Sequence, residues 1–275
     1  MKVHHVDCGT MCPWSAPLVN GSGSWCERGK MVCHCLIVET SDGLALVDTG
    51  LGTRDIEDPS RLGWGFRAAT HPVLQRDQTA LARVERLGFR AKDVRHVIPT
   101  HLDVDHAGGI SDFPHASIHI FEPELRAATE RPTAGERARY RVAQLSHDPH
   151  WVRHSSTEGG DSWLGFERIQ LLGPDLALIP LLGHTRGHCG VLVRGPEGWL
   201  LHGGDAYFFR GEVDPSPEKL PTPKGIELFQ SLAAIDNKLR RANQRRLRDL
   251  RRDHSGEVRV FSAHDPVELA AFTAS

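Results

Sequence analysis

Short apolar runs alternate with polar turns along the first half of this 275-residue chain, and the pattern predicts β-strands. The clearest pair is residues 33–40 and 44–50, which carry Val, Ile and Leu on either side of a Ser-Asp-Gly turn. Apolar and β-branched runs flanking a glycine-containing turn predict a hairpin. A sheet therefore begins near residue 33.

Helical spacing appears next, at residues 77–89. Leu81, Val84 and Leu87 recur at intervals that place them on one helical face, and Gly88 predicts the end of the helix. The segments 122–145 and 226–252 also look helical. Strands and helices both occur along the chain, so the coarse prediction is an α/β protein with helices covering a sheet.

Four later apolar runs share one feature, because each ends directly in a turn that carries histidine or aspartate. The runs are 94–100, 176–183, 198–204 and 258–263, and they lead to His101, to His184 and His188, to Asp205, and to His264. Runs of this length are typical of buried strands. In layered α/β proteins, sites gather where strand ends and loops meet at one edge of a sheet. We therefore expect these side chains to converge.

The densest of these turns is Thr-His-Leu-Asp-Val-Asp-His-Ala-Gly-Gly, residues 100–109, which supplies four metal-binding side chains: His101, Asp103, Asp105 and His106. Imidazole and carboxylate groups are the ligands that hold Zn, Fe and Mn. Together with the histidines and the aspartate after the other runs, the chain offers the seven or so donors that a pair of ions needs. A lone Asp or His is more often a cap or a surface group, but a cluster of four predicts a metal site.

Composition narrows the function classes. The formal net charge is −2, the hydrophobic fraction 39% and the charged fraction 25%, which are ordinary for a globular protein and give no overall attraction to nucleic acid or anionic membrane. No apolar run approaches the 18 residues of a membrane span, and the first residues lack the apolar stretch of a secretory signal. We expect a single cytoplasmic domain over residues 1–275. The six cysteines are expected to be reduced, although pairing of Cys8 with Cys12 or of Cys33 with Cys35 stays open.

The ordered motifs resemble the metallo-β-lactamase superfamily. Residues 100–109 are similar to its HxHxDH signature, with Leu-Val-Asp-Thr-Gly upstream and Gly-His-Thr-Arg-Gly-His, Gly-Gly-Asp and Ser-Ala-His-Asp downstream. The resemblance covers roughly residues 33–266. It implies an αββα sandwich, in which two sheets lie face to face, helices cover them, and two metal ions bind at one edge.

The resemblance also implies a role for each site residue. The ligands of the first metal would be His101, Asp103 and His188, and those of the second Asp105, His106 and His264. Asp205 matches the bridging carboxylate, and His184 would then lie outside the ligand set. Asp48 resembles the buried aspartate that orients a ligand histidine.

Within the superfamily the motifs look closest to quorum-quenching lactonases and glyoxalase II. The expected function is hydrolysis of a lactone or related ester by a metal-bridging hydroxide, with Asp105 as the proton acceptor. Lactonases place a hydroxylated ring after the bridging aspartate, and Tyr207 is the candidate here, although it comes one residue earlier than expected. The alternatives are a thioesterase of glyoxalase II type and an iron-dependent oxidoreductase on the same fold.

Asp103 departs from the signature, which has histidine at that position. A third carboxylate makes the first site harder, so zinc is expected but Fe or Mn becomes more plausible than at a three-histidine site. The competing interpretation is that Asp103 points away and that only one metal binds tightly.

Two other features bear on partners. The basic run at 238–253 suggests nucleic-acid binding, but Leu239, Leu247 and Leu250 would give that helix a core-facing stripe with its arginines in solvent, so no nucleic-acid or membrane partner is expected. An aromatic set in expected loops could line an acyl-chain site, cover the core or form a homodimer contact. Its members are Trp14, Trp25, Trp64, Phe66 and Trp151.

Overall fold

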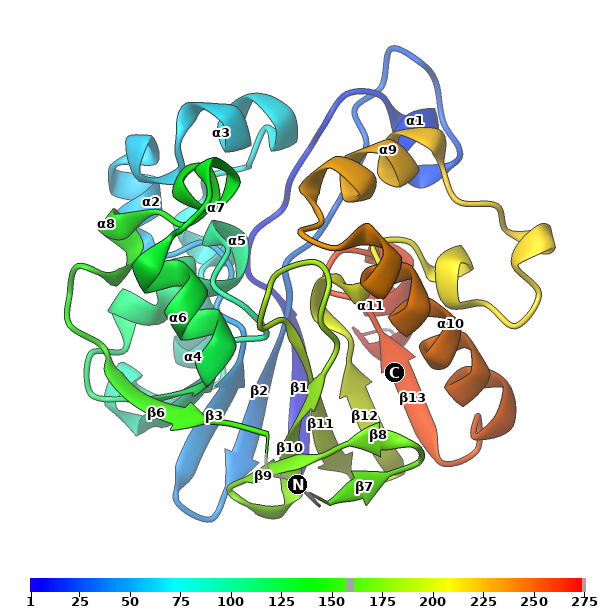
Figure 1. The fold of residues 1–275 in the computed structure, drawn as a ribbon. Helices are drawn as coiled ribbons and strands as arrows, with labels where there is room; N and C mark the ends of the chain where they lie inside the picture. Colours follow the sequence, from blue (N-terminus) through cyan, green and yellow to red (C-terminus); the bar gives the residue numbers. More distant parts are fainter. Residues whose placement is uncertain (157–160, 274–275) are drawn as a thin grey trace.

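Two β-sheets lie face to face in the middle of the molecule (Figure 1). The computed structural model describes residues 1–156 and 161–273. The first sheet contains, in spatial order, β1 (Lys2–Asp7), β2 (His34–Thr40), β3 (Gly43–Val47), β4 (Val94–Ile98), β5 (Ser117–Phe121) and β6 (His150–His154). Strands β1 to β3 pair antiparallel, and β3 to β6 pair parallel.

The second sheet contains β13 (Val258–Phe261), β12 (Gly198–His202), β11 (Cys189–Gly195), β10 (Gly173–Pro180) and β9 (Ile169–Leu171). Its strands pair antiparallel except β12 with β13. Strands β7 (Ser162–Trp163) and β8 (Phe166–Glu167) form a small separate hairpin.

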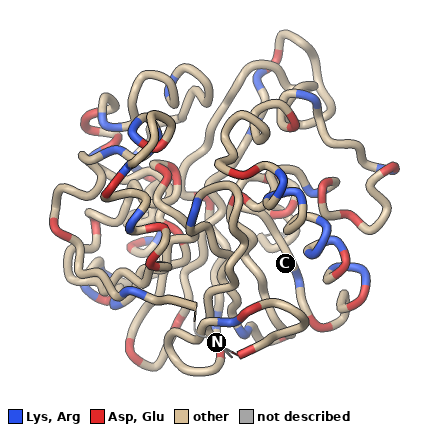
Figure 2. The backbone as a smooth tube through the Cα atoms, viewed as in Figure 1, with Lys and Arg blue, Asp and Glu red and all other residues tan. Residues whose placement is uncertain are grey.

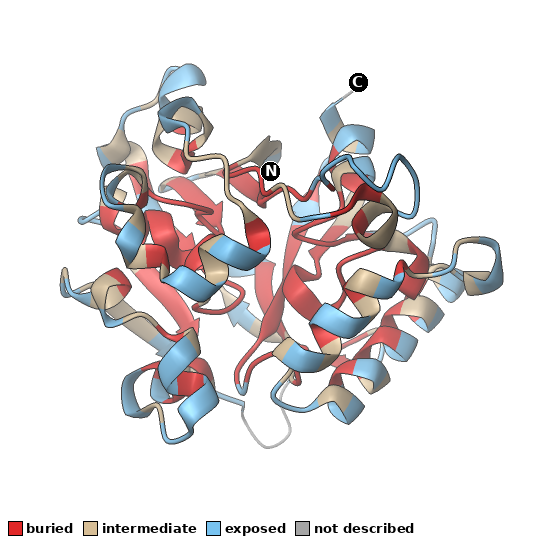
Figure 3. Cartoon of the chain, turned by 90° about the horizontal axis from the view of Figure 1, so that it is seen from above, coloured by how far each residue is buried: buried red, intermediate tan, exposed pale blue. Residues whose placement is uncertain are grey.

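Helices cover the outer faces of both sheets. On one side lie α2 (Thr53–Glu57), α3 (Trp64–Thr70), α4 (Ala80–Arg86), α5 (Val104–Ala107), α6 (Glu122–Glu130), α7 (Ala134–Arg139) and α8 (Val142–Leu145). On the other lie α1 (Ala16–Asn20), α9 (Lys224–Ala233), α10 (Asn237–Asp253) and α11 (Pro266–Thr273). Viewed from above, buried residues fill the central sheets and exposed residues line the outer sides of the helices (Figure 3). The predicted αββα layering is confirmed.

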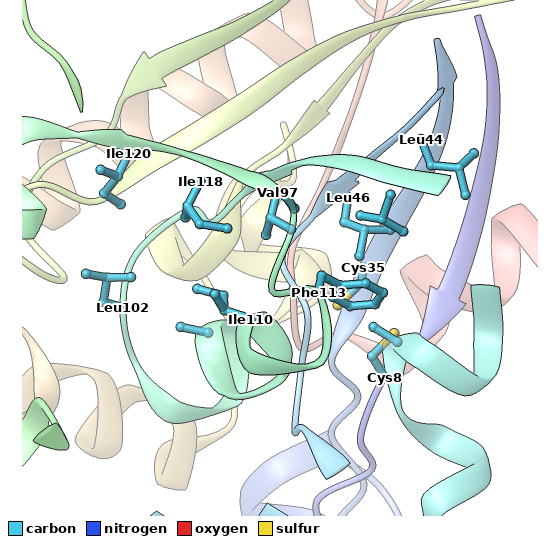
Figure 4. Close-up of a cluster of buried hydrophobic side chains, with 14 of the residues drawn as sticks. Cys8, Cys35, Leu44, Leu46, Val97, Leu102, Ile110, Phe113, Ile118 and Ile120 are labelled. Carbon is cyan, nitrogen blue, oxygen red and sulfur yellow. The ribbon is translucent and has the colours of Figure 1, made fainter. Parts of the chain in front are cut away.

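The period-2 alternation of β2 explains why the sheet is buried on both faces. Leu36 and Val38 point between the two sheets, where they join a cluster that includes Val191 of the second sheet. Cys35 and Ile37 point the other way, into the cluster under the helices (Figure 4). Because successive side chains of a strand alternate between its faces, a strand that is apolar throughout can serve both layers.

The helix predicted over 226–252 is instead two helices, and the break between them is set by tertiary contacts. Helix α9 ends at Ala233 and α10 begins at Asn237. The backbone N–H groups of Ile235 and Asp236 bond to the carbonyl oxygens of His184 and Gly183, at 3.1 and 2.9 Å. These two hydrogen bonds hold the loop after β10. Because Ile235 and Asp236 use their N–H groups on that loop, the helix is interrupted here although the sequence pattern continues. The segment 122–145 is likewise divided, into α6, α7 and α8.

The core-facing stripe predicted for α10 is only partly correct. Leu247 and Leu250 are buried, but Leu239 is 39% exposed. The first half of the helix instead buries Arg240 and Gln244 among polar partners. The basic run, which Figure 2 shows in blue along α10, is therefore not a uniformly solvated face.

The remaining predictions on loops and cysteines have mixed outcomes. All six cysteines are unpaired, so neither of the two pairings that were left open is present. Trp151 lies in β6 and packs against the cluster under the helices, which corrects its assignment to a loop. Trp14, Trp25 and Trp64 are exposed. Within the described residues, no helix is long and apolar enough to cross a membrane.

The packing of α10 gives a matched pair of substitutions. Leu247→Ala should lower the free energy of unfolding by about 2–5 kcal/mol, because it leaves a cavity between the helix and the second sheet. Leu239→Ala, on the same helix but exposed, should change it by no more than about 0.5 kcal/mol. Urea denaturation measures both values, and equal losses would contradict this assignment of the buried face.

Candidate metal centre

Loops that follow four strands meet at one rim of the two sheets, as the sequence predicts. His101 follows β4, His184 follows β10, Asp205 follows β12 and His264 follows β13. All four side chains are buried. Residues that are far apart in the chain thus surround one point.

Asp205 lies at the centre of this arrangement, and its two carboxylate oxygens face different histidines. Oδ2 lies 3.3 Å from Nε2 of His184 and 3.7 Å from Nε2 of His101. Oδ1 lies 3.0 Å from Nε2 of His264 and 3.2 Å from Nε2 of His106. A carboxylate with one oxygen on each side is the arrangement that can bridge two cations.

Two groups of candidate ligands result. The first group is His101, His184 and Asp205, and the second group is Asp105, His106 and His264, each with its ligand atoms within 4.8 Å of one another. Asp103 lies beside the first group, because its Oδ2 is 3.3 Å from Nε2 of His101 and 3.2 Å from Nε2 of His184. The structure thus turns Asp103 toward the site.

The site can be tested for its fit to metal ions by its unpaired polar atoms. Within the described residues, Nε2 of His101, Nε2 of His106 and Oδ1 of Asp205 are buried without a hydrogen-bond partner. An unpaired buried polar atom costs about 1–3 kcal/mol. Cations bound among them would satisfy these atoms, and their chemical types suit Zn, Fe or Mn. The residues therefore fit a pair of metal ions.

The two histidines of the Gly-His-Thr-Arg-Gly-His motif are exchanged relative to the prediction. His188 uses both ring nitrogens on backbone groups, since Nδ1 donates to the Leu181 carbonyl at 2.9 Å and Nε2 accepts the N–H of Asp205 at 2.8 Å. Burial, together with His101 and His184, holds the pKa of His188 well below its usual range. The ring is thus neutral and has no nitrogen left for a metal. His184 faces the site in its place.

Tyr207 does not reach the site, which corrects its candidacy as a catalytic residue. Its hydroxyl donates to the Glu268 carboxylate at 3.0–3.1 Å, and the ring is fully buried in the core beneath α10. The next residue, Phe208, stands at the spacing expected for the hydroxylated ring, and its ring centroid lies 4.6 Å from that of His264. The aromatic position is present, but it carries no hydroxyl.

Asp48 orients the second group in the way the resemblance implies. Its Oδ2 lies 2.8 Å from Nδ1 of His106, and its Oδ1 accepts the N–H of Thr100 at 2.7 Å. A carboxylate on one ring nitrogen directs the other toward the metal. Nδ1 of His264 is fixed similarly, by the Val32 carbonyl at 2.8 Å.

Glu124 ties the two ligand loops together. It is fully buried in α6 and accepts hydrogen bonds from the backbone N–H of Leu102 and of Gly187 and from the hydroxyl groups of Tyr140 and Thr185. One carboxylate therefore holds both the loop after β4 and the loop after β10. Sequence reasoning missed it, because a glutamate near a helix start carries no signal beyond helix propensity.

Arg139, at the end of α7, is the cation beside Asp103. Its Nε lies 3.5 Å from Oδ1 of Asp103, and its guanidinium donates to the carbonyl oxygens of His184 and Ala233. The side chain is largely buried. Arg139 was also missed, since nothing in the local sequence separates it from the solvent-facing arginines around it.

The surrounding charges shift the pKa values of the three aspartates of the centre in different directions. Burial alone would raise the pKa of Asp205, but His264 and His106 hold it well below its usual range. Asp103 is held low against burial by Arg139 and His101. Burial raises the pKa of Asp105. His106 and His264 lower it, but the negative charges of Asp205 and Asp103 raise it further, and the net shift is upward. Asp105 is thus the carboxylate of the three that holds a proton most readily.

Comparison with known protein families assigns the chain to one of them. The model of the metallo-beta-lactamase superfamily matches residues 28–258. The chain belongs to the metallo-β-lactamase superfamily. The resemblance seen in the motifs is therefore confirmed.

Individual relatives indicate the class of enzyme within the superfamily. A probable metallo-hydrolase of Mycobacterium tuberculosis is 39% identical over 279 residues, which span 100% of this chain and 84% of the relative. An N-acyl homoserine lactonase, AttM, of Rhizobium johnstonii is 29% identical over 173 residues, covering 58% of this chain and 59% of the relative. The chain is a metallo-hydrolase of this superfamily, related to lactonases.

Solved structures agree with the fold. An N-acyl homoserine lactone hydrolase with N-hexanoyl-L-homoserine at its catalytic metal centre superposes with a TM-score of 0.72 at 19% identity, covering 98% of this chain and 95% of that one. AidC, a dizinc quorum-quenching lactonase, gives 0.62 at 17% identity, covering 96% and 87%. At these identities the likeness shows the metallo-β-lactamase fold.

Glu268, the partner of Tyr207, predicts a pH dependence of stability. Burial and the nearby Asp265 raise the pKa of Glu268 to about 7. The folded protein thus binds this proton more tightly than the unfolded chain does, so the stabilisation is present below pH 4.5 and is lost as the pH rises through 7. Relative to wild type, Glu268→Gln should gain up to about 3 kcal/mol between pH 5 and pH 8, measured by urea denaturation. The exposed control Glu218→Gln should show no such trend, and a parallel pH profile for Glu268→Gln would contradict the raised pKa.

Proposed function

We propose that this metallo-hydrolase is dinuclear and opens a lactone or a related carboxylic ester. The observation that carries the proposal is the Asp205 carboxylate, which presents one oxygen to each of two separate ligand groups. The first ion would be held by His101, Asp103, His184 and Asp205, and the second by Asp105, His106, Asp205 and His264. His184 thereby takes the place assigned to His188 from the sequence. Zinc is the proposed metal, and Fe or Mn stays plausible because of Asp103.

Two bound divalent ions would lower the pKa of a water molecule and polarise a substrate carbonyl. Side chains of the protein would supply the proton transfer and hold the metal ligands in position. Asp105 lies at the edge of the second group, with its Oδ2 3.6 Å from Nε2 of His264, and would take up a proton and return it to the leaving group. Asp48 and Glu124 hold the ligand loops in place, so the donors need little rearrangement.

No tyrosine assists this chemistry. The chain has two tyrosines, and both hydroxyl groups donate to buried glutamates, Tyr140 to Glu124 and Tyr207 to Glu268. In this chain the ring beside the centre is Phe208. Metal ions held by the two ligand groups would then supply the positive charge that stabilises the developing negative charge on the substrate.

The surroundings of Phe208 favour an apolar substituent on the substrate. Its ring lies 5.7 Å from that of Phe229, in α9. Leu228 and Leu232 of the same helix are 62% and 78% exposed. An apolar surface thus extends outward from the metal centre along α9, which suits an acyl chain better than a charged group. The names of the lactonase relatives agree with this substrate class.

An iron-dependent oxidoreductase is the second candidate, because Asp103 adds a hard oxygen donor to the first group. A thioesterase of glyoxalase II type remains the alternative within the hydrolases. Acyl-homoserine lactones of two chain lengths, S-lactoylglutathione and an aryl ester separate the hydrolytic candidates, and oxygen uptake by the same preparation tests the oxidoreductase. Oxygen uptake without hydrolysis would overturn the proposed function.

Removing the central carboxylate should abolish the activity. Asp205→Asn leaves a single oxygen and no charge between the two groups, so we expect the bound metal to fall from two ions to at most one per chain, and kcat to fall at least about 100-fold. Inductively coupled plasma mass spectrometry measures the metal, and the substrate panel measures the activity. EDTA should inactivate the wild type, and zinc should restore it.

The matched control is Asp77→Asn, an exposed aspartate remote from the ligand loops. It should keep two ions and full activity. Two ions bound to Asp205→Asn, or wild type that stays active after complete removal of metal, would contradict the dinuclear assignment.

The exchange of the two histidines can be tested in the same way. His184→Gln should lose one metal ion per chain, because it removes a donor of the first group. His188→Gln should retain two ions and lose about 1–3 kcal/mol of stability, since it leaves backbone groups of Leu181 and Asp205 without their partner. Metal content and urea denaturation of both variants measure this, and the reverse pattern of metal loss would reinstate His188 as the ligand.

A further inference from the structure

A cavity separate from the metal centre is lined by residues of α9, of α10 and of the segment that precedes α9. Figure 1 shows where these two helices lie. The volume of the cavity is about 380 Å³, within the range of small-molecule sites. The cationic side chains that line it are Lys224, Arg240, Arg241, Arg245 and Arg248. None of the candidate metal ligands lines this cavity. We propose that it binds a small phosphorylated molecule, and we call it the arginine pocket.

The arginine pocket has an excess of positive charge. Five cationic side chains line it against two acidic ones, Glu212 and Glu227, which leaves an excess of three. Figure 2 shows the row of basic residues along α10. Arg241 and Arg245 stand four positions apart on one helix, a spacing at which like charges repel. The arrangement is unfavourable for folding by itself, and an anion would relieve it.

The two acidic residues already have partners in the protein, and those of Glu227 are two of the pocket's own cations. Glu212 is buried and accepts hydrogen bonds from the backbone N–H of Phe208 and from the side-chain amides of Gln230 and Gln244. Glu227 pairs with Lys224 at 3.2 Å and more distantly with Arg241 at 3.8 Å. Both carboxylates are thus paired with groups of the protein itself.

Arg245 and Arg248 are the residues left for a ligand. Among the described residues, neither guanidinium has a carboxylate within 4.0 Å, and the Arg245 side chain makes no hydrogen bond. Nε of Arg248 is buried and has no partner, although its Nη2 donates to the Glu212 carbonyl at 2.7 Å. By contrast, Arg252 on the same helix is paired with Asp249 and Asp253. Two of the arginines that line the pocket are therefore without a carboxylate partner among the described residues.

The chemistry of these groups favours phosphate. Guanidinium groups present forked N–H donors that match the oxygens of a phosphate, and the Thr222 hydroxyl at the same pocket adds a neutral donor. An excess of three charges in one concavity suits a compact, multiply charged anion. A nucleic acid would need an extended basic surface, and the carboxylates around Arg252 interrupt that surface outside the pocket.

Isothermal titration of the metal-loaded protein with inorganic pyrophosphate tests the proposal. We expect one saturable site per chain at 150 mM NaCl, weakening as salt is raised. Arg245→Gln should weaken binding at least about tenfold without loss of stability, because Arg245 makes no contact that the fold needs. The matched control Arg252→Gln should bind as wild type does. Because pyrophosphate also binds metals, Asp205→Asn is titrated in parallel and should keep the site.

Three results would overturn the proposal that the arginine pocket binds a small phosphorylated molecule. Absence of saturable binding, or equal affinity in Arg245→Gln and wild type, would overturn the arginine pocket. Loss of binding in Asp205→Asn would assign the anion to the metal centre and also overturn it. Tighter binding of a 20-base-pair DNA duplex, weakened equally by Arg245→Gln and Arg252→Gln, would replace the small molecule with nucleic acid. None of these results depends on which ester the metal centre hydrolyses.

Discussion

A buried carboxylate surrounded by four histidines is the constraint on which the rest of the site depends. Asp205 is only 3% exposed and touches both ligand groups. A charge removed from water is tolerated only when it is paired, so every strand that ends near Asp205 has to deliver a partner. Two facing sheets accomplish this, because they bring four strand ends to one rim.

The groups behind the ligands keep that pairing rigid. Asp48 fixes the ring of His106, and the Val32 carbonyl fixes His264. Glu124 accepts four hydrogen bonds from the two ligand loops and from Tyr140. A ligand held by packing and hydrogen bonds loses less conformational entropy when a metal binds, and the fold itself supplies these supports. The break between α9 and α10 belongs to the same support, since it bonds the His184 loop.

Asp103 and Arg139 are best understood as a pair. An aspartate in place of the usual histidine adds a negative charge to the first group, and Arg139 lies 3.5 Å away with a fixed positive charge. The guanidinium faces Oδ1, which leaves Oδ2 directed to His101 and His184. The net charge of the centre is thus kept near that of a three-histidine site, while the donor set becomes harder.

Local patterns of the sequence alone predicted a mixed α/β fold and converging strand ends, because apolar period, turn residues and closely spaced His and Asp are local features. The αββα layers and the candidate ligand set came from the resemblance of the ordered motifs to the metallo-β-lactamase superfamily. The sequence did not determine which histidine of Gly-His-Thr-Arg-Gly-His faces the centre, whether Tyr207 or Phe208 stands beside it, or where α9 ends. Those depend on which backbone groups lie within hydrogen-bonding distance after folding: the Asp205 N–H for His188, the Glu268 carboxylate for Tyr207, and the His184 loop for Ile235. Arg139 and Glu124 act across distances in sequence that no local pattern records, so only the tertiary structure could assign them.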